Sequence, residues 1–246
     1  MNPTLDINTI ETLGAMECAP NYHNWLLDEF KPHFGKNIVE VGSGTGSITK
    51  KLLENNIDKL FSIEPSEMVY QQLILSVNSY LQEINSPVIF DGINSFLVDA
   101  IQKLKNEKID TFIYINVLEH VEKDEEELNQ IYSILENGGK LLIFVPALQW
   151  LYGTHDLNVG HFRRYYKKDL QKKVEQAGFK VLKNNYFDFL GILPWWVAFR
   201  VLKIKYLKDG QSKLYDRFIV PIERKIERKI APFVGKNLLL VAEKIS

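Results

Sequence analysis

Apolar and polar positions along the chain follow two alternating periods. Short, almost wholly apolar runs, typical of buried strands, occupy residues 38–41, 60–63, 87–90, 109–115 and 140–146. After several of these runs, apolar side chains recur every three or four residues, as in helices with one buried face; such segments lie at 48–55, 66–77 and 124–135. Strands that alternate with helices in this way predict a parallel sheet with helices on both faces.

Two further strands are predicted near the end of the chain. One begins at 179–182, after a helix at 168–177, and the last covers 236–242. Roughly 50 residues separate them, where a hairpin loop usually has two to five. We therefore expect a single α/β domain over residues 1–246. It has a doubly wound, mostly parallel seven-stranded sheet, an N-terminal cap segment at 1–34, and a helical insertion at 187–235 before the last strand.

Composition and charge narrow the function classes. The 246 residues are 46% apolar, which is ordinary for a globular protein. The net charge of −1 argues against a nucleic-acid partner, and a single cysteine excludes a disulfide framework and a cysteine metal site. No metal site is predicted, since the acidic run 122–127 is explained by a helix N-terminus. The chain shows neither a signal pattern nor an apolar run of about 20 residues, so we expect a cytoplasmic protein.

A glycine-rich turn follows the first predicted strand. Gly42, Gly44 and Gly46 are spaced G-x-G-x-G, and a turn without Cβ atoms lets a ligand approach the backbone. A nicotinamide-dependent dehydrogenase would favour a glycine at Ser47 and a residue other than Glu40 before the turn. A carboxylate at Glu40 suits a cation better than a pyrophosphate. The turn therefore favours a cationic cofactor that has no phosphate.

The stretch from Glu40 to Gly46 resembles the first motif of class I S-adenosylmethionine (SAM)-dependent methyltransferases, and Asn116 to Val121 resembles their fourth. The resemblance implies a Rossmann-like fold, SAM as cofactor and S-adenosylhomocysteine as product. It also implies the cofactor contacts. We expect Glu64, at the end of the second strand, to hold the ribose hydroxyls. Further contacts are implied for a larger set: Tyr22 at the methionine end or as a packing residue, Asp91 at the adenine amino group, Asn116 beside the sulfonium, and Leu118 against adenine or methionine.

A polar loop after the fifth strand is expected to form the acceptor site. Asp156-x-x-x-Gly-His161-x-Arg163-Arg164-Tyr resembles a pattern in one methyltransferase subgroup. His161 is a candidate general base, and His120 is a second candidate or a structural residue. Arg163 and Arg164 are predicted to bind a carboxylate or phosphate. The alternative is a salt-bridge network that shapes the loop. We favour a mixture in which Asp156 pairs with one arginine and His161 faces the acceptor.

The predicted insertion combines aromatic and basic residues. Trp195 and Trp196 lie in an apolar segment, and residues 200–230 carry ten Lys or Arg against four Asp or Glu. Such a segment can form a lid over the acceptor site. The alternative is a lid that also contacts a membrane surface through residues 190–230. We expect a small or amphipathic acceptor that is lipid-linked, a glycan or an acidic aromatic compound, and we favour O-methylation. A SAM-binding protein without catalytic activity is the main alternative.

Overall fold

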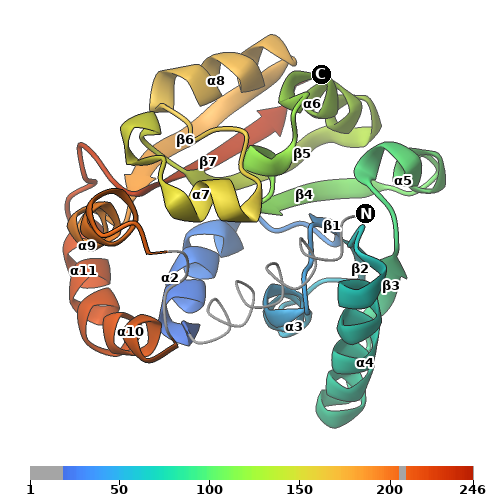
Figure 1. The fold of residues 1–246 in the computed structure, drawn as a ribbon. Helices are drawn as coiled ribbons and strands as arrows, with labels where there is room; N and C mark the ends of the chain where they lie inside the picture. Colours follow the sequence, from blue (N-terminus) through green and yellow to red (C-terminus); the bar gives the residue numbers. More distant parts are fainter. Residues whose placement is uncertain (1–18, 205–208, 246) are drawn as a thin grey trace.

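The computed structural model describes residues 19–204 and 209–245. Seven strands form one sheet in the order β3-β2-β1-β4-β5-β7-β6, as Figure 1 shows. All neighbouring strands are parallel except β7, which runs antiparallel to β5 and β6. The predicted fold class is confirmed. The strands are β1 (Asn37–Val41), β2 (Lys59–Ile63), β3 (Ile89–Ile93), β4 (Ile109–Ile115), β5 (Leu135–Pro146), β6 (Phe179–Phe187) and β7 (Asn237–Lys244).

Helices cover both faces of this sheet because successive strand residues point to opposite sides. Val39, Phe61 and Phe112 lie opposite one another in β1, β2 and β4 and join one buried core. Their neighbours Ile38 and Leu60 join the other. Side chains of α5 (Leu97–Leu104), α6 (Asp124–Ile134) and α8 (Lys167–Gln176) complete the first core. Side chains of α2 (Pro20–Phe30), α3 (Ser47–Leu53) and α4 (Glu67–Ile84) complete the second, and Figure 1 shows the two groups of helices on opposite sides of the sheet.

Two predicted strand boundaries require correction. The third strand covers Ile89–Ile93 instead of 87–90, because its register places Asp91 opposite Phe61 in the middle of β2. The fifth strand begins at Leu135 instead of residue 140, directly after α6, and includes Gly138 and Gly139. The first correction moves the carboxyl end of β3 by a few residues, and the second moves the start of β5 by a few residues. Only the first affects a candidate site residue.

The segment between β6 and β7 is helical, as predicted. It contains α9 (Ile192–Trp196), a π-helical turn Val197–Val201, α10 (Asp209–Leu214), a second π-helical turn Tyr215–Ile219 and α11 (Val220–Glu227). Since the last three are contiguous, they form one helix over 209–227. Figure 1 shows this segment beside α2, at the edge of the sheet that carries β6 and β7. None of the helices in the described residues is long and apolar enough to span a bilayer.

Asp188 fixes the base of this insertion. Its buried carboxylate accepts hydrogen bonds from Tyr22 in α2 (3.0 Å), Gly191 (2.9 Å) and Tyr215 (2.6 Å), and Lys236 lies 2.7 Å away. Asp188 adopts a positive φ of 63°, which turns the chain out of the edge strand. One side chain therefore ties the start of the insertion to its long helix, to α2 and to the start of β7.

Candidate active site

The glycine turn connects β1 to α3 at the carboxyl edge of the sheet. Gly42 and Gly46 have positive φ values of 70° and 91°, where a Cβ is strained. A Cβ on Gly42 would lie 2.4 Å from the Val117 side chain, and one on Gly46 would lie 3.0 Å from Leu73 and Val77. The turn is therefore wedged between α4 and the loop after β4. Its glycines are required by packing as well as by backbone conformation.

Glu64 lies directly beyond the end of β2 and meets this turn. Its Oε2 atom accepts a hydrogen bond from the Gly44 amide at 3.0 Å, and Oε1 accepts one from the Ser66 amide at 3.0 Å. The side chain is largely buried. The carboxylate therefore sits between the glycine turn and the start of α4, at the position expected for a ribose contact.

Glu40 supports the turn from beneath. Thr49 donates a hydrogen bond of 2.6 Å to its Oε2 atom, and Ser62 donates one of 3.1 Å. Burial raises the pKa of the Glu40 carboxyl to about 7, although these hydrogen bonds act in the opposite direction. The expectation that Glu40 meets the cofactor's positive charge is thus modified, because its carboxylate is held by α3 and β2.

Three other predicted cofactor residues occupy different environments. Asn116 follows β4 with a positive φ of 54°, at the carboxyl edge. Leu118 is fully buried in the core beside it. Asp91 is a correction: it lies in the middle of β3, and its carboxylate pairs with Lys103 of α5 at 2.8 Å. The residue after β3 is Asn94, whose amide donates to the Glu64 carbonyl at 2.9 Å. Asn94 was not predicted because the strand was ended too early.

These groups fit SAM better than a dinucleotide. The turn from Glu40 to Thr49 contains no basic residue to meet a pyrophosphate, and the two nearest carboxylates are Glu40 and Glu64. Glu64 supplies acceptor oxygens, and Asn94 and Asn116 supply amides after the ends of β3 and β4. If SAM binds at this edge, Glu64 would hold its ribose hydroxyls, and the backbone of the glycine turn would lie close to the cofactor.

The loop after β5 is organised by one buried carboxylate. Asp156 Oδ1 lies 2.7 Å from His161 Nδ1 and accepts a hydrogen bond of 2.8 Å from Arg164 Nε, while Oδ2 accepts one from the Gly153 amide. Burial alone would raise the pKa of Asp156, but these partners lower it to about 2. The loop is also bonded to the fourth motif, because the Phe162 amide donates to the Glu119 carbonyl at 2.9 Å.

This bond places His161 against Glu119 and His120. His161 Nε2 lies 3.7 Å from Glu119 Oε1, and the rings of His161 and His120 meet edge-on with centroids 4.6 Å apart. The Glu119 side chain is completely buried, and neither carboxylate oxygen has a hydrogen-bond partner among the described residues. Burial raises its pKa to about 7. We call Glu119, His120 and His161 the EHH cluster.

The predicted substrate role of the two arginines is not supported. Arg164 is buried on Asp156, and Arg163 bonds Asp124 at 2.8 Å and the Glu122 carbonyl at 2.7 Å. The predicted salt-bridge network therefore includes both arginines, because each guanidinium group pairs with a buried carboxylate, Asp156 or Asp124. His161 differs from the two arginines, because Asp156 binds its Nδ1 atom and leaves its Nε2 atom facing Glu119.

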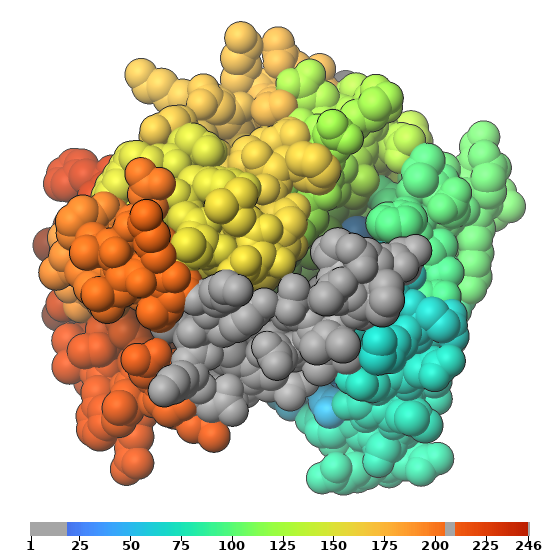
Figure 2. Space-filling view, viewed as in Figure 1, coloured from blue at the N-terminus to red at the C-terminus, as the bar shows by residue number. Residues whose placement is uncertain are grey.

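The aromatic residues predicted to contact ligands form contacts between the loop after β5, the insertion and α2. Trp195 packs its ring on His155 (4.9 Å) and Phe199 (4.4 Å), whereas Trp196 is 40% exposed. The Thr154 hydroxyl donates to backbone carbonyls of the insertion, and Figure 2 shows the two segments side by side. Tyr22 directs its hydroxyl to Asp188, so it anchors α2 where a methionine contact was expected.

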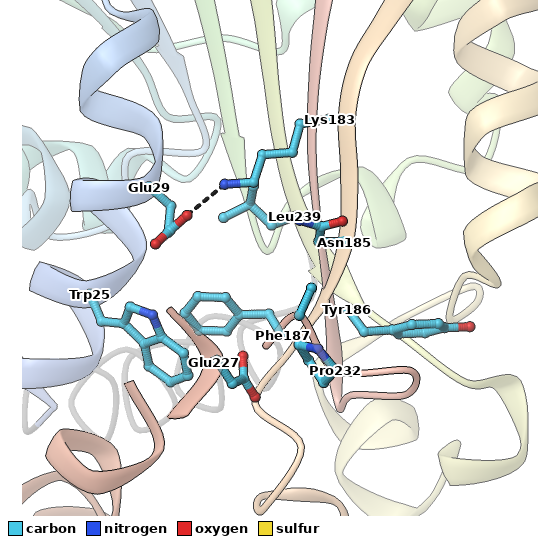
Figure 3. A pocket seen from close by; sticks show the side chains of 10 residues that line it. Trp25, Glu29, Lys183, Asn185, Tyr186, Phe187, Glu227, Pro232 and Leu239 are labelled. Carbon is cyan, nitrogen blue, oxygen red and sulfur yellow. Dashed lines mark hydrogen bonds and ion pairs between the residues drawn. The ribbon is translucent and has the colours of Figure 1, made fainter. Parts of the chain in front are cut away.

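A small pocket opens elsewhere, between α2, β6 and the end of α11. Figure 3 shows it lined by Trp25 and Phe187, with the ion pair of Lys183 and Glu29 (2.5 Å) at its side. None of its lining residues belongs to the glycine turn or to the EHH cluster. We therefore assign the candidate site to the carboxyl edge of the strands.

Comparison with known proteins supports this assignment. A family described as "Methyltransferase domain" matches residues 18–184, so the chain belongs to this methyltransferase family. An uncharacterized methyltransferase of Anoxybacillus flavithermus is 30% identical over 120 residues, covering 48% of this chain and 50% of the relative. One from Schizosaccharomyces pombe is 26% identical over 140 residues, covering 56% and 49%. The chain thus spans about half the length of the curated relatives it matches.

The fold is shared with solved structures. A SAM-dependent methyltransferase from Archaeoglobus fulgidus superposes with a TM-score of 0.58 over 89% of this chain and 91% of its own, at 17% identity. At that identity the likeness establishes the fold alone. The class of protein defined by fold and family is a methyltransferase.

Glu119, like Asn94, is a candidate residue that the sequence did not indicate. The fourth motif drew attention to its neighbours Asn116, Leu118 and His120, while Glu119 itself resembled an ordinary charged residue in a loop. The available signal was its place between apolar Leu118 and Val121 in a segment expected to be buried. A carboxylate in such a segment requires a partner.

Proposed function

We propose that this protein transfers the methyl group of SAM to an oxygen atom of an amphipathic acceptor. The observation that carries the proposal is the EHH cluster, in which Glu119 and His120 follow β4 shortly after Asn116 and His161 comes from the loop after β5. Polar residues at this point of the sheet adjoin the expected position of the sulfonium. The glycine turn, Glu64 and the family match support SAM as the donor.

The chemistry needs a positioned acceptor and a place for one proton. As the acceptor oxygen forms its bond to the methyl carbon, the sulfur–carbon bond breaks and its electron pair stays on sulfur. The acceptor hydroxyl loses its proton, and we assign this loss to the EHH cluster. His161 is the residue on which turnover should depend most, because Asp156 fixes its ring and leaves Nε2 directed at Glu119.

The insertion supports an amphipathic or lipid-linked acceptor. It lies against the loop that carries His161, and its outer surface exposes Leu193, Trp196 and Leu202. An acceptor with an apolar part could therefore reach the cluster along this surface. A protein of this kind would work at the cytoplasmic face of a membrane, in peripheral contact with it.

Two measurements test the function. Calorimetry with S-adenosylhomocysteine should show binding, whereas NAD should give none. Transfer of labelled methyl from SAM to a panel of phenols, hydroxylated lipids and amines should favour a hydroxyl compound. His161→Gln should reduce that turnover about a hundredfold or more and leave the affinity for S-adenosylhomocysteine unchanged.

Arg163→Gln is the matched control from the same loop. Its guanidinium faces Asp124 and Glu122, so turnover should remain within a few-fold of wild type. Binding of S-adenosylhomocysteine without transfer to any acceptor would instead favour a SAM-binding protein without catalytic activity. Equal turnover in wild type and His161→Gln would remove the cluster from the mechanism.

A further inference from the structure

We propose that the EHH cluster binds a divalent transition-metal cation. Glu119, His120 and His161 come from two different loops, and each offers one ligand atom, all three within 4.8 Å of one another. Some point between three such atoms lies no more than about 2.8 Å from each of them. Shifts of well under about 1 Å would bring all three to the ~2.0–2.2 Å at which zinc, for example, binds nitrogen and oxygen.

The strongest observation is the state of Glu119. Its side chain is fully buried, and both oxygens lack a hydrogen-bond partner within the described part of the chain. A buried carboxylate without partners is costly, and protein interiors normally pair such groups with a donor or a cation. A cation at the cluster would satisfy this carboxylate and would account for its burial.

His161 is held as metal-bound histidines usually are. The Asp156 carboxylate accepts the hydrogen of Nδ1 in the tautomer of His161 that has its lone pair on Nε2. That lone pair faces Glu119 Oε1 at 3.7 Å, which places two acceptor atoms opposite each other. A carboxylate behind a histidine is the common outer-shell arrangement of metal sites. Arg164 and the Gly153 amide in turn hold Asp156 in place.

The donor set indicates which cations fit. Two imidazoles and one carboxylate suit Mn²⁺, Fe²⁺, Co²⁺ or Zn²⁺, while Mg²⁺ and Ca²⁺ prefer oxygen ligands. Three protein ligands leave at least one position open, as in catalytic metal sites. His120 is exposed, so this open position can face solvent or a bound molecule.

The role of the metal site in catalysis rests on the proposed function, whereas the existence of the site does not. With an acceptor hydroxyl bound to the cation, the pKa of that hydroxyl falls and its proton passes to solvent water. The oxygen then forms the bond to the methyl carbon while the sulfur keeps the electron pair of the broken bond. His161 in this arrangement holds the cation, and its loss still abolishes turnover.

Co²⁺ is the probe of choice, because its visible absorption reports ligand number and geometry. Untagged full-length protein, stripped with EDTA, should bind one Co²⁺ per chain with new absorption bands. Zn²⁺ should displace the Co²⁺, and a tenfold excess of Mg²⁺ should not. Glu119→Gln and His120→Gln should each weaken Co²⁺ binding at least about tenfold.

Two controls keep the outcome decisive. His33→Gln removes a histidine outside the cluster and should leave Co²⁺ affinity unchanged. His120 is exposed, so its variant reports on the site even if Glu119→Gln unfolds. Absence of stoichiometric Co²⁺ binding, or equal affinity in wild type and His120→Gln, would overturn the inference. Calorimetry with S-adenosylhomocysteine on the same samples separates the two proposals, since a Co²⁺ site without cofactor binding contradicts only the proposed function.

Discussion

At the scale of single residues, acidic side chains near the carboxyl edge differ through their partners. Glu40 and Glu64 follow similar sequence patterns at the ends of neighbouring strands. Glu40 is bonded by side chains of α3 and β2, whereas Glu64 is bonded by backbone amides of the glycine turn and of α4. Of the two, Glu64 therefore remains the one placed to exchange these contacts for ribose hydroxyls.

Glu64→Ala should weaken binding of S-adenosylhomocysteine by about 1–3 kcal/mol, the usual cost of losing a hydrogen bond to a charged group. The same substitution removes an anchor of the glycine turn, so a small loss of thermal stability is expected with it. Isothermal titration calorimetry measures the affinity directly. Asp91→Asn is the matched control, because Asp91 lies in mid-strand on Lys103 and should not affect the cofactor. If Asp91→Asn weakens binding as much as Glu64→Ala does, the assignment of Asp91 to a purely structural ion pair with Lys103 is wrong.

Residue positions were more predictable than residue partners. The sequence favoured Asp156 paired with one arginine and His161 facing the acceptor, and the structure shows Asp156 bonded to both Arg164 and His161. It could not indicate that Arg163 and Arg164, adjacent in sequence, would turn to different carboxylates. In an irregular loop no periodicity fixes side-chain direction, so neighbouring residues are equivalent until tertiary contacts are known.

At the scale of elements, acidic residues bond the long helix of the insertion to α2 and to the first residues of the insertion. On the helix over 209–227, Asp216 accepts from the amides of Asn21 and Tyr22, and Glu223 accepts from the Leu190 amide. Glu227 accepts from the Phe189 amide. The long gap between the last two strands predicted an inserted helix. Its docking was not predictable, since Asn21 and Asp216 lie 195 positions apart.

The buried acids should make this docking sensitive to pH. Burial, with Asp188 nearby, raises the pKa of Glu223 to about 8, and burial raises that of Glu227 to about 7. The unfolded chain releases these protons near pH 4.5, so between about pH 4.5 and 8 the folded form holds more protons than the unfolded one. Stability therefore falls as pH rises through this window. Hydrogen exchange of residues 209–227 should be slower at pH 6 than at pH 8.5, after correction for the intrinsic exchange rate.

Glu223→Gln separates this effect from general alkaline loosening. The amide keeps an oxygen for the Leu190 amide and carries no charge, so the pH dependence of protection in the helix should shrink. Exchange in α4, on the other side of the glycine turn, provides the internal reference. A variant with the same pH dependence as wild type would show that Glu223 does not control docking.

At the scale of the whole molecule, the charges of the insertion are sorted by face. Asp216, Glu223 and Glu227 of the helix over 209–227 point inward, as described above. Its outer surface carries Leu214, Phe218, Ile222 and Ile226, four residues apart and each more than half exposed. Exposed basic residues accompany them: Lys213, Arg217, Lys225, Arg228 and Lys229. An apolar stripe among cations, with the anions turned away, is typical of a helix that lies on an anionic bilayer.

The apolar stripe and the cations around it together predict that binding depends on lipid composition. The protein should sediment with vesicles of phosphatidylglycerol and phosphatidylcholine, and weakly with phosphatidylcholine alone, because the cations need anionic headgroups. The double variant Phe218→Ser, Ile222→Ser should reduce vesicle affinity about tenfold or more, since each side chain loses the gain from leaving water. Leu75→Ser is the matched control: Leu75 is 74% exposed on α4, outside the insertion, and should not contribute. Equal binding by all three proteins would assign the exposed stripe to a protein partner. Loss of vesicle binding with unchanged turnover on a water-soluble hydroxyl acceptor would separate membrane attachment from the chemistry at the EHH cluster.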